Sequence, residues 1–389
     1  MIFAFFIIFL SSTVLSVAYV QHRASIEGTG ERFVRKHLCA YSDSYTLEEL
    51  QTMATQYDLV IVHNDSVAVT LKTRKPAIIV LLYADVMAMH EHYEGWKEVS
   101  SRDDWFVHDY EGSKLLHKDF NWYLMDVGNQ GWVNYYIGRV KVKLESFGYD
   151  GVFADDVWSS LDVEFCRELD HRPAPPAANK IAAWHADMLE MLKAVRKSIG
   201  NKLLVYNGVD WKDLDLDYLE VADGVMLEGF ARPRLSEVEW KRQLSRLEDA
   251  GKRGKIFLAQ SLIAPTATKQ KGLVQMFCLA SHLLGADKTS FFNVAENYTS
   301  LDYLPECNLE IGHPIGSYYE SQGVYQRRFA CGTVLVNPSE ASRKVRLDEA
   351  YGTAYIESGR PTVLTRELLR ELTLQPRSGA ILAKHHFDK

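Results

Sequence analysis

The sequence predicts an eight-stranded (β/α) barrel, a TIM barrel, followed by a small C-terminal antiparallel β domain. With 389 residues, the chain has room for a barrel of roughly 250 residues and an accessory unit. Hydrophobic residues make up 47% and charged residues 24%, which is the composition of a globular protein with a sizeable core. Short apolar runs alternate with segments of helical period, as in βα units with a parallel sheet.

Eight apolar runs have the length and composition of buried β-strands. They are residues 37–41, 59–62, 77–82, 151–155, 203–206, 224–227, 256–259 and 289–294. Two intervening segments repeat apolar residues at spacings of three and four, which predicts helices that cover the barrel. The first repeat consists of Val133, Ile137, Val140, Leu144 and Phe147, and the second of Ile181, Trp184, Met188, Leu192, Val195 and Ile199.

The interval between the third and fourth strands, from about Tyr83 to Asp150, is too long for a simple connection. It contains four tryptophans, Trp96, Trp105, Trp122 and Trp132. Structureless loops of this length are uncommon in compact domains, so we expect short elements here that form one wall of the cleft. The proline-rich residues 171–176 predict a stiff loop after the fourth strand.

After about Val324 the pattern changes to alternating strands separated by turn signals. The expected strands are residues 325–330, 333–336, 344–347, 353–356 and 380–383. We therefore expect a barrel catalytic domain over residues 31–322 and a β-sandwich-like accessory domain over residues 323–389.

Met1 to Val20 is almost wholly apolar, which predicts a membrane-directed leader. It fits a signal peptide cleaved near Ser16-Val17-Ala18 or an uncleaved anchor, because about 20 apolar residues suffice to span a bilayer. Either alternative predicts a secreted or membrane-anchored protein. The triplets at 64–66 and 297–299 fit the N-glycosylation pattern, which matters only in a eukaryotic secretory route.

Charge and cysteine content exclude several classes of function. The formal net charge is −7, whereas nucleic-acid-binding proteins present a basic face. The five cysteines are scattered without C-x-x-C spacing, so no thiol or cysteine–metal site is indicated. We expect no cofactor. The 8 Trp and 20 Tyr include rings that suit the faces of sugars.

Two segments share one pattern, Asp-Gly-Val, an apolar pair and then a carboxylate: residues 150–155 and 223–228. In each segment the acid, Asp155 or Glu228, stands at the C-terminal end of a strand, where barrel active sites lie. Strand alternation directs both acids toward the barrel mouth. Glycoside cleavage needs such a pair, one acid for the leaving oxygen and one carboxylate to attack the anomeric carbon or activate water.

A competing interpretation makes each acid the N-cap of the following helix, a common role for Asp at such turns. The repeated pattern favours a catalytic role for Asp155 and Glu228. Asp156, next to Asp155, is free to serve as the cap or to support its neighbour at the substrate site. Other strand ends carry polar groups that could bind hydroxyls, and two tryptophans could stack on sugars. These candidates are Tyr41, Tyr83, Asn207, Gln260 and Asn293, with Trp158 and Trp105.

A metal site is the weaker alternative. His90-Glu91-His92 has H-x-H spacing, but it follows the third strand and no further ligands appear at later strand ends. The serine nucleophile motif G-x-S-x-G and glycine-rich phosphate loops are absent from the sequence.

The chain resembles glycoside-hydrolase-like barrels related to the endo-α-1,4-polygalactosaminidase family, over about residues 35–385. The segments that carry the resemblance are WFVHD at 105–109, LMDVGN at 124–129, GYDGVFADD at 148–156, YNG at 206–208, EGF at 228–230 and EIGHPIG at 310–316. The resemblance implies a catalytic Asp155, a second carboxylate at Glu228 and an accessory C-terminal β domain. The leading hypothesis is thus a glycosidase of a polysaccharide or oligosaccharide; the alternatives are a non-catalytic carbohydrate-binding barrel and a metal-dependent hydrolase.

Overall fold

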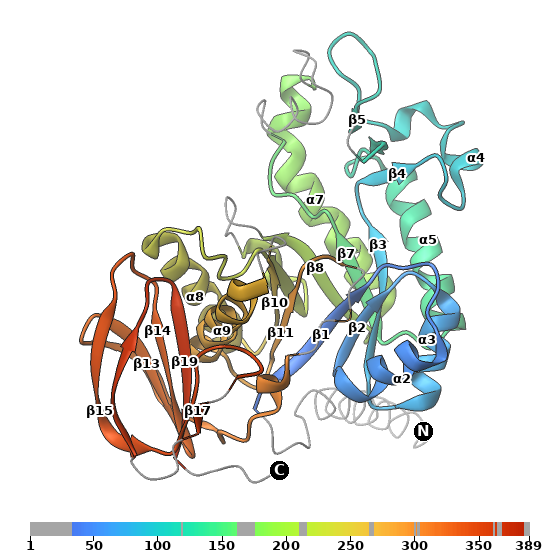
Figure 1. Ribbon diagram of the computed structural model, residues 1–389. Coiled ribbons are helices and arrows are strands. Elements are labelled where there is room, and N and C mark those ends of the chain that lie inside the picture. Colours follow the sequence, from blue (N-terminus) through green and yellow to red (C-terminus); the bar gives the residue numbers. More distant parts are fainter. Residues whose placement is uncertain are drawn as a thin grey trace, which may run out of the picture.

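Eight parallel strands close into a barrel in the computed structural model, which describes residues 33–117, 120–161, 176–209, 216–263, 268–298, 301, 304–360, 362–363 and 368–384. Around the ring the order is β1, β2, β3, β7, β8, β9, β10, β11 (Figure 1). The bounds are β1 (Arg35–Ala40), β2 (Leu59–Val62), β3 (Ile79–Asp85), β7 (Gly151–Asp155), β8 (Leu203–Val209), β9 (Gly224–Glu228), β10 (Ile256–Leu262) and β11 (Ser290–Ala295). Each predicted run forms one of these strands, so the predicted barrel is confirmed.

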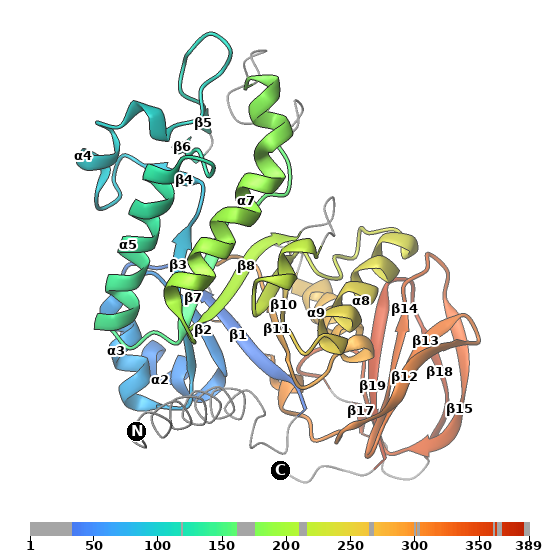
Figure 2. The same cartoon turned by 180° about the vertical axis from the view of Figure 1, so that it is seen from behind.

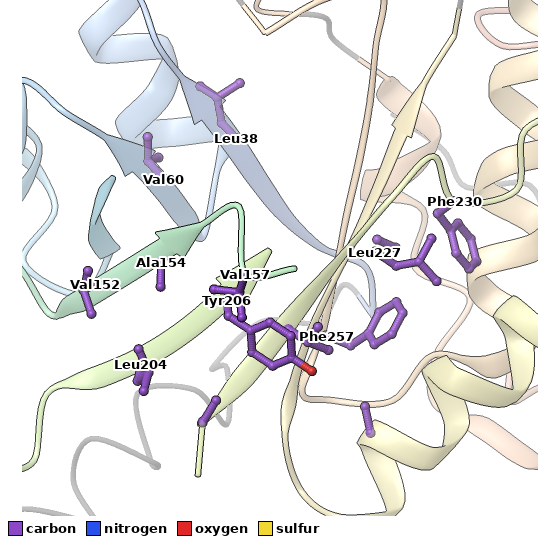
Figure 3. Close-up of a cluster of buried hydrophobic side chains, with 14 of the residues drawn as sticks. Leu38, Val60, Val152, Ala154, Val157, Leu204, Tyr206, Leu227, Phe230 and Phe257 are labelled. Carbon is purple, nitrogen blue, oxygen red and sulfur yellow. The ribbon is translucent and has the colours of Figure 1, made fainter. Parts of the chain in front are cut away.

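Alternate residues of the strands fill the inside of the barrel. This inner set is Cys39, Leu59, Ile61, Ile79, Leu81, Phe153, Leu203, Val205, Met226, Ile256, Leu258 and Phe291. The other set faces the helices, and Figure 3 shows part of this outer layer, with Val152 and Ala154 on β7 and Leu204 and Tyr206 on β8. Side chains alternate along a strand. The residue two positions after the last inner residue of a strand therefore points into the barrel mouth.

The glycine of each Asp-Gly-Val segment stands where neighbouring strands approach closely. A Cβ on Gly151 would lie 2.2 Å from the carbonyl oxygen of Leu203, and a Cβ on Gly224 would lie 2.5 Å from the Cβ of Ile256. Both glycines share the inner face with the acids that end their strands. A side chain at either position would therefore push neighbouring strands apart at the base of the barrel.

Among the described residues, six helices cover the strands: α2 (Leu47–Gln56), α3 (Asp65–Arg74), α5 (Gln130–Ser146), α7 (Ala178–Ile199), α8 (Glu237–Lys252) and α9 (Thr268–Gly285). The two predicted helical repeats lie in α5 and α7. Side-chain oxygens accept backbone N–H groups at several helix starts, for example Asn129 before α5 and Ser236 before α8. Within the described ranges, we find no helix with the length and apolarity needed to cross a membrane.

The segment between β3 and β7 carries its own short elements, as predicted. They are β4 (Ala88–His90), α4 (Trp96–Val99), the 3-10 helix η1 (Asp103–Trp105), β5 (Leu116–His117) and β6 (Trp122–Leu124). The three strands form an antiparallel sheet in the order β4, β6, β5. This insertion stands above the barrel beside the N-terminal part of α7 (Figure 2).

The C-terminal part consists of two antiparallel sheets. The larger contains β12 (Pro314–Ser321), β13 (Val324–Phe329), β14 (Gly332–Asn337), β19 (Ser378–Ala383), β16 (Thr353–Tyr355) and β17 (Thr362–Val363); the smaller pairs β15 (Arg343–Tyr351) with β18 (Leu369–Leu374). Apolar side chains of the two sheets, including Leu335 and Val345, form one buried cluster. The opposite face of the larger sheet packs on α9 through Val334 and Ile381 (Figure 1).

Some of the sequence-based predictions concern residues that the structure does not describe. The leader Met1 to Val20 lies outside the described residues, as do residues 171–175 of the predicted stiff loop. Pro176 is described, and it forms an isolated antiparallel bridge with Asp109 of the insertion.

Candidate active site

Asp155 and Glu228 are the last residues of β7 and β9, the fourth and sixth strands of the barrel. Phe153 and Met226, two residues before them, belong to the inner set, so strand alternation turns both carboxylates into the mouth. The two strands are separated in the ring by β8 alone. The carboxylates therefore stand on one side of the mouth, with the end of β8 between them.

Asn207 on β8 connects the two carboxylates. Its Nδ2 donates to Asp155 Oδ1 at 2.8 Å and to Glu228 Oε2 at 3.2 Å. The backbone around it is fixed, because Val157 N donates to Asn207 O at 2.7 Å and a Cβ on Gly208 would lie 1.9 Å from Val157 O. The Asn-Gly pair thus lets the chain leaving β7 pass directly against β8.

Three tyrosines line the opposite side of the carboxylate pair. Tyr83 is hydrogen-bonded to Asp155, and Tyr298 to Glu228. The Tyr41 ring lies between them, with its centroid 4.8 Å from that of Tyr83 and 5.3 Å from that of Tyr298. Burial, followed by the nearby carboxylate charges, raises the pKa of both Tyr83 and Tyr298, so they remain hydrogen-bond donors over the working pH range.

Asp85 and Asp156 bring two more carboxyl groups to Asp155. Asp85 is paired in register with Asp155, and its Oδ1 accepts the N–H groups of Met87 and Ala88 at 3.0 and 2.7 Å. Asp156 has a left-handed backbone, φ 54°, and is hydrogen-bonded to Asp85. Burial and the charge of Asp155 raise the pKa of Asp85 to about 7, and burial raises that of Asp156 as well. Both shifts favour the protonated form, so burial and neighbouring charge make this pair retain a proton more readily than ordinary carboxyl groups do.

Burial also raises the pKa of Asp155, and the charge of Glu228 adds to the rise. The hydrogen bonds from Tyr83, Asn207 and the backbone N–H of Asp156 act in the opposite direction, since donors stabilise the charged carboxylate. Perturbed carboxyl groups gathered in a barrel mouth are typical of a catalytic site.

Gln260 and Asn293, two predicted substrate-binding residues, are both buried. Gln260 is fully buried and its Oε1 accepts from Asn293 Nδ2 at 3.1 Å, while Asn293 is 7% exposed. Gln260 is paired in register with Glu228, and Asn293 with Gln260, so both lie at the level of the candidate catalytic acid. Their contact with substrate stays a prediction.

The two candidate tryptophan platforms have different surroundings. Trp158 follows the β7 end, is partly exposed, and its ring centroid lies 5.9 Å from that of Trp122 in the insertion. Trp105 is 9% exposed and packs against Trp132 and Tyr135 at the start of α5. The structure keeps Trp158 at the rim and places Trp105 in the packing of the insertion.

The helix-cap alternative is not supported by the described helices. The first described helix after β7 is α7, whose N-cap is Ala177, and the one after β9 is α8, whose N-cap is Ser236. Neither Asp155 nor Glu228 caps either helix. Asp156 likewise lies among the carboxyl groups at the mouth and not at a described helix start.

The metal alternative finds no ligand set around the histidine pair. His90 and His92 stack at a ring distance of 4.9 Å in the insertion. In the part of the chain that the structure describes, the one group close enough to ligate a metal is Asp85, Asp155 and Asp156, with ligand atoms within 4.8 Å of one another. Oxygen ligands of this kind suit a hard cation, but neither histidine of the H-x-H pair belongs to this group.

Sequence reasoning missed Asp85 and Tyr298. Asp85 was detectable, because it lies two residues after Tyr83 and the strand alternation that selected Tyr83 also selects Asp85. Tyr298 follows β11 in a turn, where no periodicity indicates the direction of a side chain; its triplet was noted only as a glycosylation pattern.

Comparison with known proteins agrees with this fold. Residues 72–333 match hypothetical glycosyl hydrolase family 15. No curated protein sequence matches the chain.

Several solved structures are similar in fold. One is the maltogenic α-amylase AmyB from Thermotoga neapolitana, with 14% identity over 90% of this chain and 98% of that chain and a TM-score of 0.53. Another is the trehalulose synthase MutB, with 11% identity, coverage of 91% and 99% and a TM-score of 0.54. The glycoside hydrolase domain of PelA from Pseudomonas aeruginosa matches at 15% identity over 68% of this chain and 96% of that domain, with a TM-score of 0.48.

The barrel with carboxyl groups at its mouth defines the class as a glycoside-hydrolase-like TIM barrel. Since the family match covers more than half of the sequence, the chain belongs to hypothetical glycosyl hydrolase family 15. At these low identities the solved structures support the fold alone.

Proposed function

We propose that the protein hydrolyses glycosidic bonds in a polysaccharide or oligosaccharide, with Asp155 and Glu228 as the catalytic pair. The observation that carries the proposal is the double hydrogen bond of Asn207, which ties the ends of the fourth and sixth strands together. Two carboxylates held on one side of a barrel mouth are the arrangement that cleavage of a glycosidic bond requires. Family membership supports the same reaction.

The spacing favours a retaining mechanism. Because one nitrogen bonds both carboxylates, their bonded oxygens cannot be farther apart than twice the longer bond of 3.2 Å. One amide group that bridges both carboxylates keeps them close together, which favours the separation of about 5–5.5 Å of retaining enzymes over the roughly 6.5–9.5 Å of inverting ones. Direct attack by one carboxylate on the anomeric carbon fits the narrower gap.

We assign the nucleophile to Asp155 because three donors, from Tyr83, Asn207 and the N–H of Asp156, oppose the rise in its pKa that burial causes. Asp155 would bond to the anomeric carbon while Glu228 donates its proton to the departing oxygen. Glu228 would then take a proton from water, and that water would displace Asp155. Tyr298 would hold the Glu228 carboxyl group in position through its hydrogen bond.

The test is release of reducing sugar from a panel of polysaccharides by the wild type and by the isosteric variants Asp155→Asn and Glu228→Gln. Each variant should lose roughly 10²-fold or more in kcat, because acid–base or nucleophilic chemistry is removed. Circular dichroism and thermal unfolding should remain those of the wild type. Normal turnover in either variant would contradict the assignment, and binding of the polysaccharides without reducing-end release would identify a carbohydrate-binding barrel instead.

The two roles can be separated with aryl glycosides, whose leaving groups need little protonation. On such substrates Glu228→Gln should regain much of the wild-type rate of bond cleavage, whereas Asp155→Asn should not. The reverse result would exchange the two roles. Product analysis by NMR should give retention at the anomeric carbon.

We also propose that the protein acts outside the cytosol, on the strength of the apolar sequence from Met1 to Val20. N-terminal sequencing of the exported protein would test this, since cleavage after the leader gives a new N-terminus and an uncleaved anchor does not. A protein found entirely in the cytosol would refute the proposal.

A further inference from the structure

A cavity of about 590 Å³ opens beside the carboxylate pair. It lies between the ends of β2 and β3, helix α5 and the segment that follows β4. Its inner end is lined by Tyr41, Tyr83 and Asp85, which also line the barrel mouth. The cavity is therefore continuous with the candidate active site and extends away from it on the side of the first three strands. Its volume is typical of a small-molecule binding site.

The cavity combines an apolar floor with a polar rim. Leu82, Ala84, Ala88, Met89 and Val140 form the floor, together with the rings of Trp132 and Tyr136. Asp43, His63, His92, Glu94, Arg139 and Lys143 provide the polar groups. A sugar ring offers matching surfaces, because its C–H faces pack on apolar and aromatic side chains while its hydroxyl groups bond to polar ones.

The charges of the rim are compensated. Arg139 Nη2 lies 2.7 Å from Glu94 Oε2, and Lys143 Nζ lies 2.7 Å from Asp65 Oδ2. Because each Arg and Lys that lines the cavity is paired with a carboxylate, a strongly charged ligand would have to break an ion pair. These groups still offer donors and acceptors to hydroxyl groups, which favours a neutral ligand.

Hydrogen bonds within the protein hold the walls of the cavity in place. Trp132 Nε1 donates to Val86 O at 2.9 Å, and Tyr136 Oη donates to Ala84 O at 3.1 Å, which fixes α5 against the end of β3. Gly95 has φ 92°, and a Cβ there would lie 1.9 Å from the Tyr135 hydroxyl. The glycine thus lets the outer wall close on α5, where the Arg139–Glu94 pair holds it.

Tyr93 is an aromatic residue of the same cavity wall as Asp85 of the barrel mouth. It lines the cavity and is 47% exposed, so one face of its ring is open to a ligand. Burial of the rest of the side chain, followed by the charges of Asp85 and Asp155, raises its pKa to about 12. The hydroxyl group therefore stays protonated and can donate to a ligand.

We propose that this cavity is a binding subsite for neutral sugar units of the same chain whose glycosidic bond lies at Asp155 and Glu228, and that Tyr93 is its stacking residue. The proposal rests on the proposed glycosidase activity. It predicts that cleavage improves as the substrate becomes long enough to fill the cavity. It also predicts that the gain depends on Tyr93.

The experiment compares oligosaccharides of increasing length prepared from cellulose, xylan, amylose and galactan. For the wild type, Tyr93→Ala and the matched control Tyr110→Ala, kcat/KM is measured on the shortest and the longest oligosaccharide cleaved. Tyr110 is another exposed tyrosine of the insertion, 65% exposed, and does not line the cavity. The ratio of kcat/KM for the longest oligosaccharide to that for the shortest should fall about tenfold in Tyr93→Ala. The fall should come mainly from a higher KM, because the lost contact binds the substrate and the transition state equally. The control should keep the wild-type ratio.

A second variant, Ala88→Phe, fills the floor of the cavity and should lower the ratio in the same way. If it does not fold, Arg139→Met, which removes a polar group from the rim, takes its place. An unchanged ratio in Tyr93→Ala, with normal cleavage by the wild type, would overturn the subsite and leave the glycosidase proposal standing. Failure of the wild type to cleave any of these oligosaccharides would overturn both.

Discussion

Asp150 and Asp223 begin the two Asp-Gly-Val segments and make the same contacts at the base of the barrel. Asp150 Oδ2 accepts from Val80 N at 2.8 Å and from a lysine of α3, and Asp223 Oδ2 accepts from Leu204 N at 2.9 Å and from Arg196. In each case the carboxylate ties the strand it precedes to the neighbouring strand and to a helix. The repeated pattern thus has a structural acid at its start and a candidate catalytic acid at its end.

Substitution of the first acid of a segment should therefore affect stability, whereas substitution of the last acid should affect catalysis. Asp150→Asn and Asp223→Asn should each lower the free energy of unfolding by about 1–3 kcal/mol, because a charged acceptor of buried bonds is lost. Turnover per folded molecule should remain within a few-fold of the wild type. Urea unfolding combined with active-site titration measures both quantities. A large loss of kcat in Asp150→Asn without a loss of stability would mean that the segment does not divide in this way.

At the scale of residues, strand alternation alone was sufficient to select the side chains that enter the mouth. Tyr83, Asp155, Asn207 and Glu228 follow the inner set of their strands, and each points as predicted. Alternation gives the direction of a side chain but not its exposure: Gln260 is fully buried, and its contact with substrate stays a prediction. Alternation also does not reach side chains in turns, such as Tyr298.

At the scale of elements, Arg327 links the C-terminal sheet to the barrel. Arg327 lies on β13, and its Nη1 donates to Leu283 O at 3.1 Å and to Ala286 O at 2.7 Å, at the C-terminal end of α9. The last carbonyl groups of a helix have no partner within the helix. The guanidinium group therefore caps α9 from the neighbouring sheet.

Arg327→Met keeps the aliphatic stem and removes the donors, so the carbonyl groups lose their charged partner. We expect a loss of about 1–3 kcal/mol in the free energy of unfolding. The neighbouring Arg328 is a matched control, because it forms an exposed ion pair with Asp348 at 2.8 Å, and Arg328→Met should cost less than about 1 kcal/mol. Thermal unfolding of the two variants side by side gives the comparison. Equal losses would show that Arg327 does not hold the sheet on α9.

The sequence predicted the existence of the elements better than their limits. The antiparallel sheet begins at Pro314 with β12, before the change of pattern that we located at Val324, because β12 is an exposed edge strand with little apolar alternation. Strand β3 continues to Asp85, beyond its apolar run. In both places the hydrogen-bonded pairing of the strands extends beyond the apolar residues. A single sequence does not show where such backbone pairing ends.

At the scale of the whole molecule, two buried histidines connect the barrel with α9. His37 on β1 and His282 on α9 are each at most 1% exposed, and the Nδ1 atom of each has no hydrogen-bond partner among the residues that the structure describes. His37 Nε2 bonds to Ala259 O at 3.3 Å, and His282 packs on Phe230 and Phe292. Burial lowers the pKa of His37 to about 4 and that of His282 to about 3.

These shifts predict a specific loss of stability in acid. An unfolded histidine takes up a proton near pH 6.5, whereas the folded ones do so only near their lowered pKa values, so the unfolded state binds more protons between these limits. The free energy of unfolding should therefore fall as the pH falls from about 6.5 toward 4, by up to about 1.4 kcal/mol per pH unit for each histidine. His282→Leu removes one of the two groups and should reduce this slope by that amount, whereas replacement of the exposed His313 by Leu should not change it. Urea unfolding at a series of pH values measures the slope, and an equal slope in His282→Leu and the wild type would mean that His282 is not a neutral buried group in the folded protein.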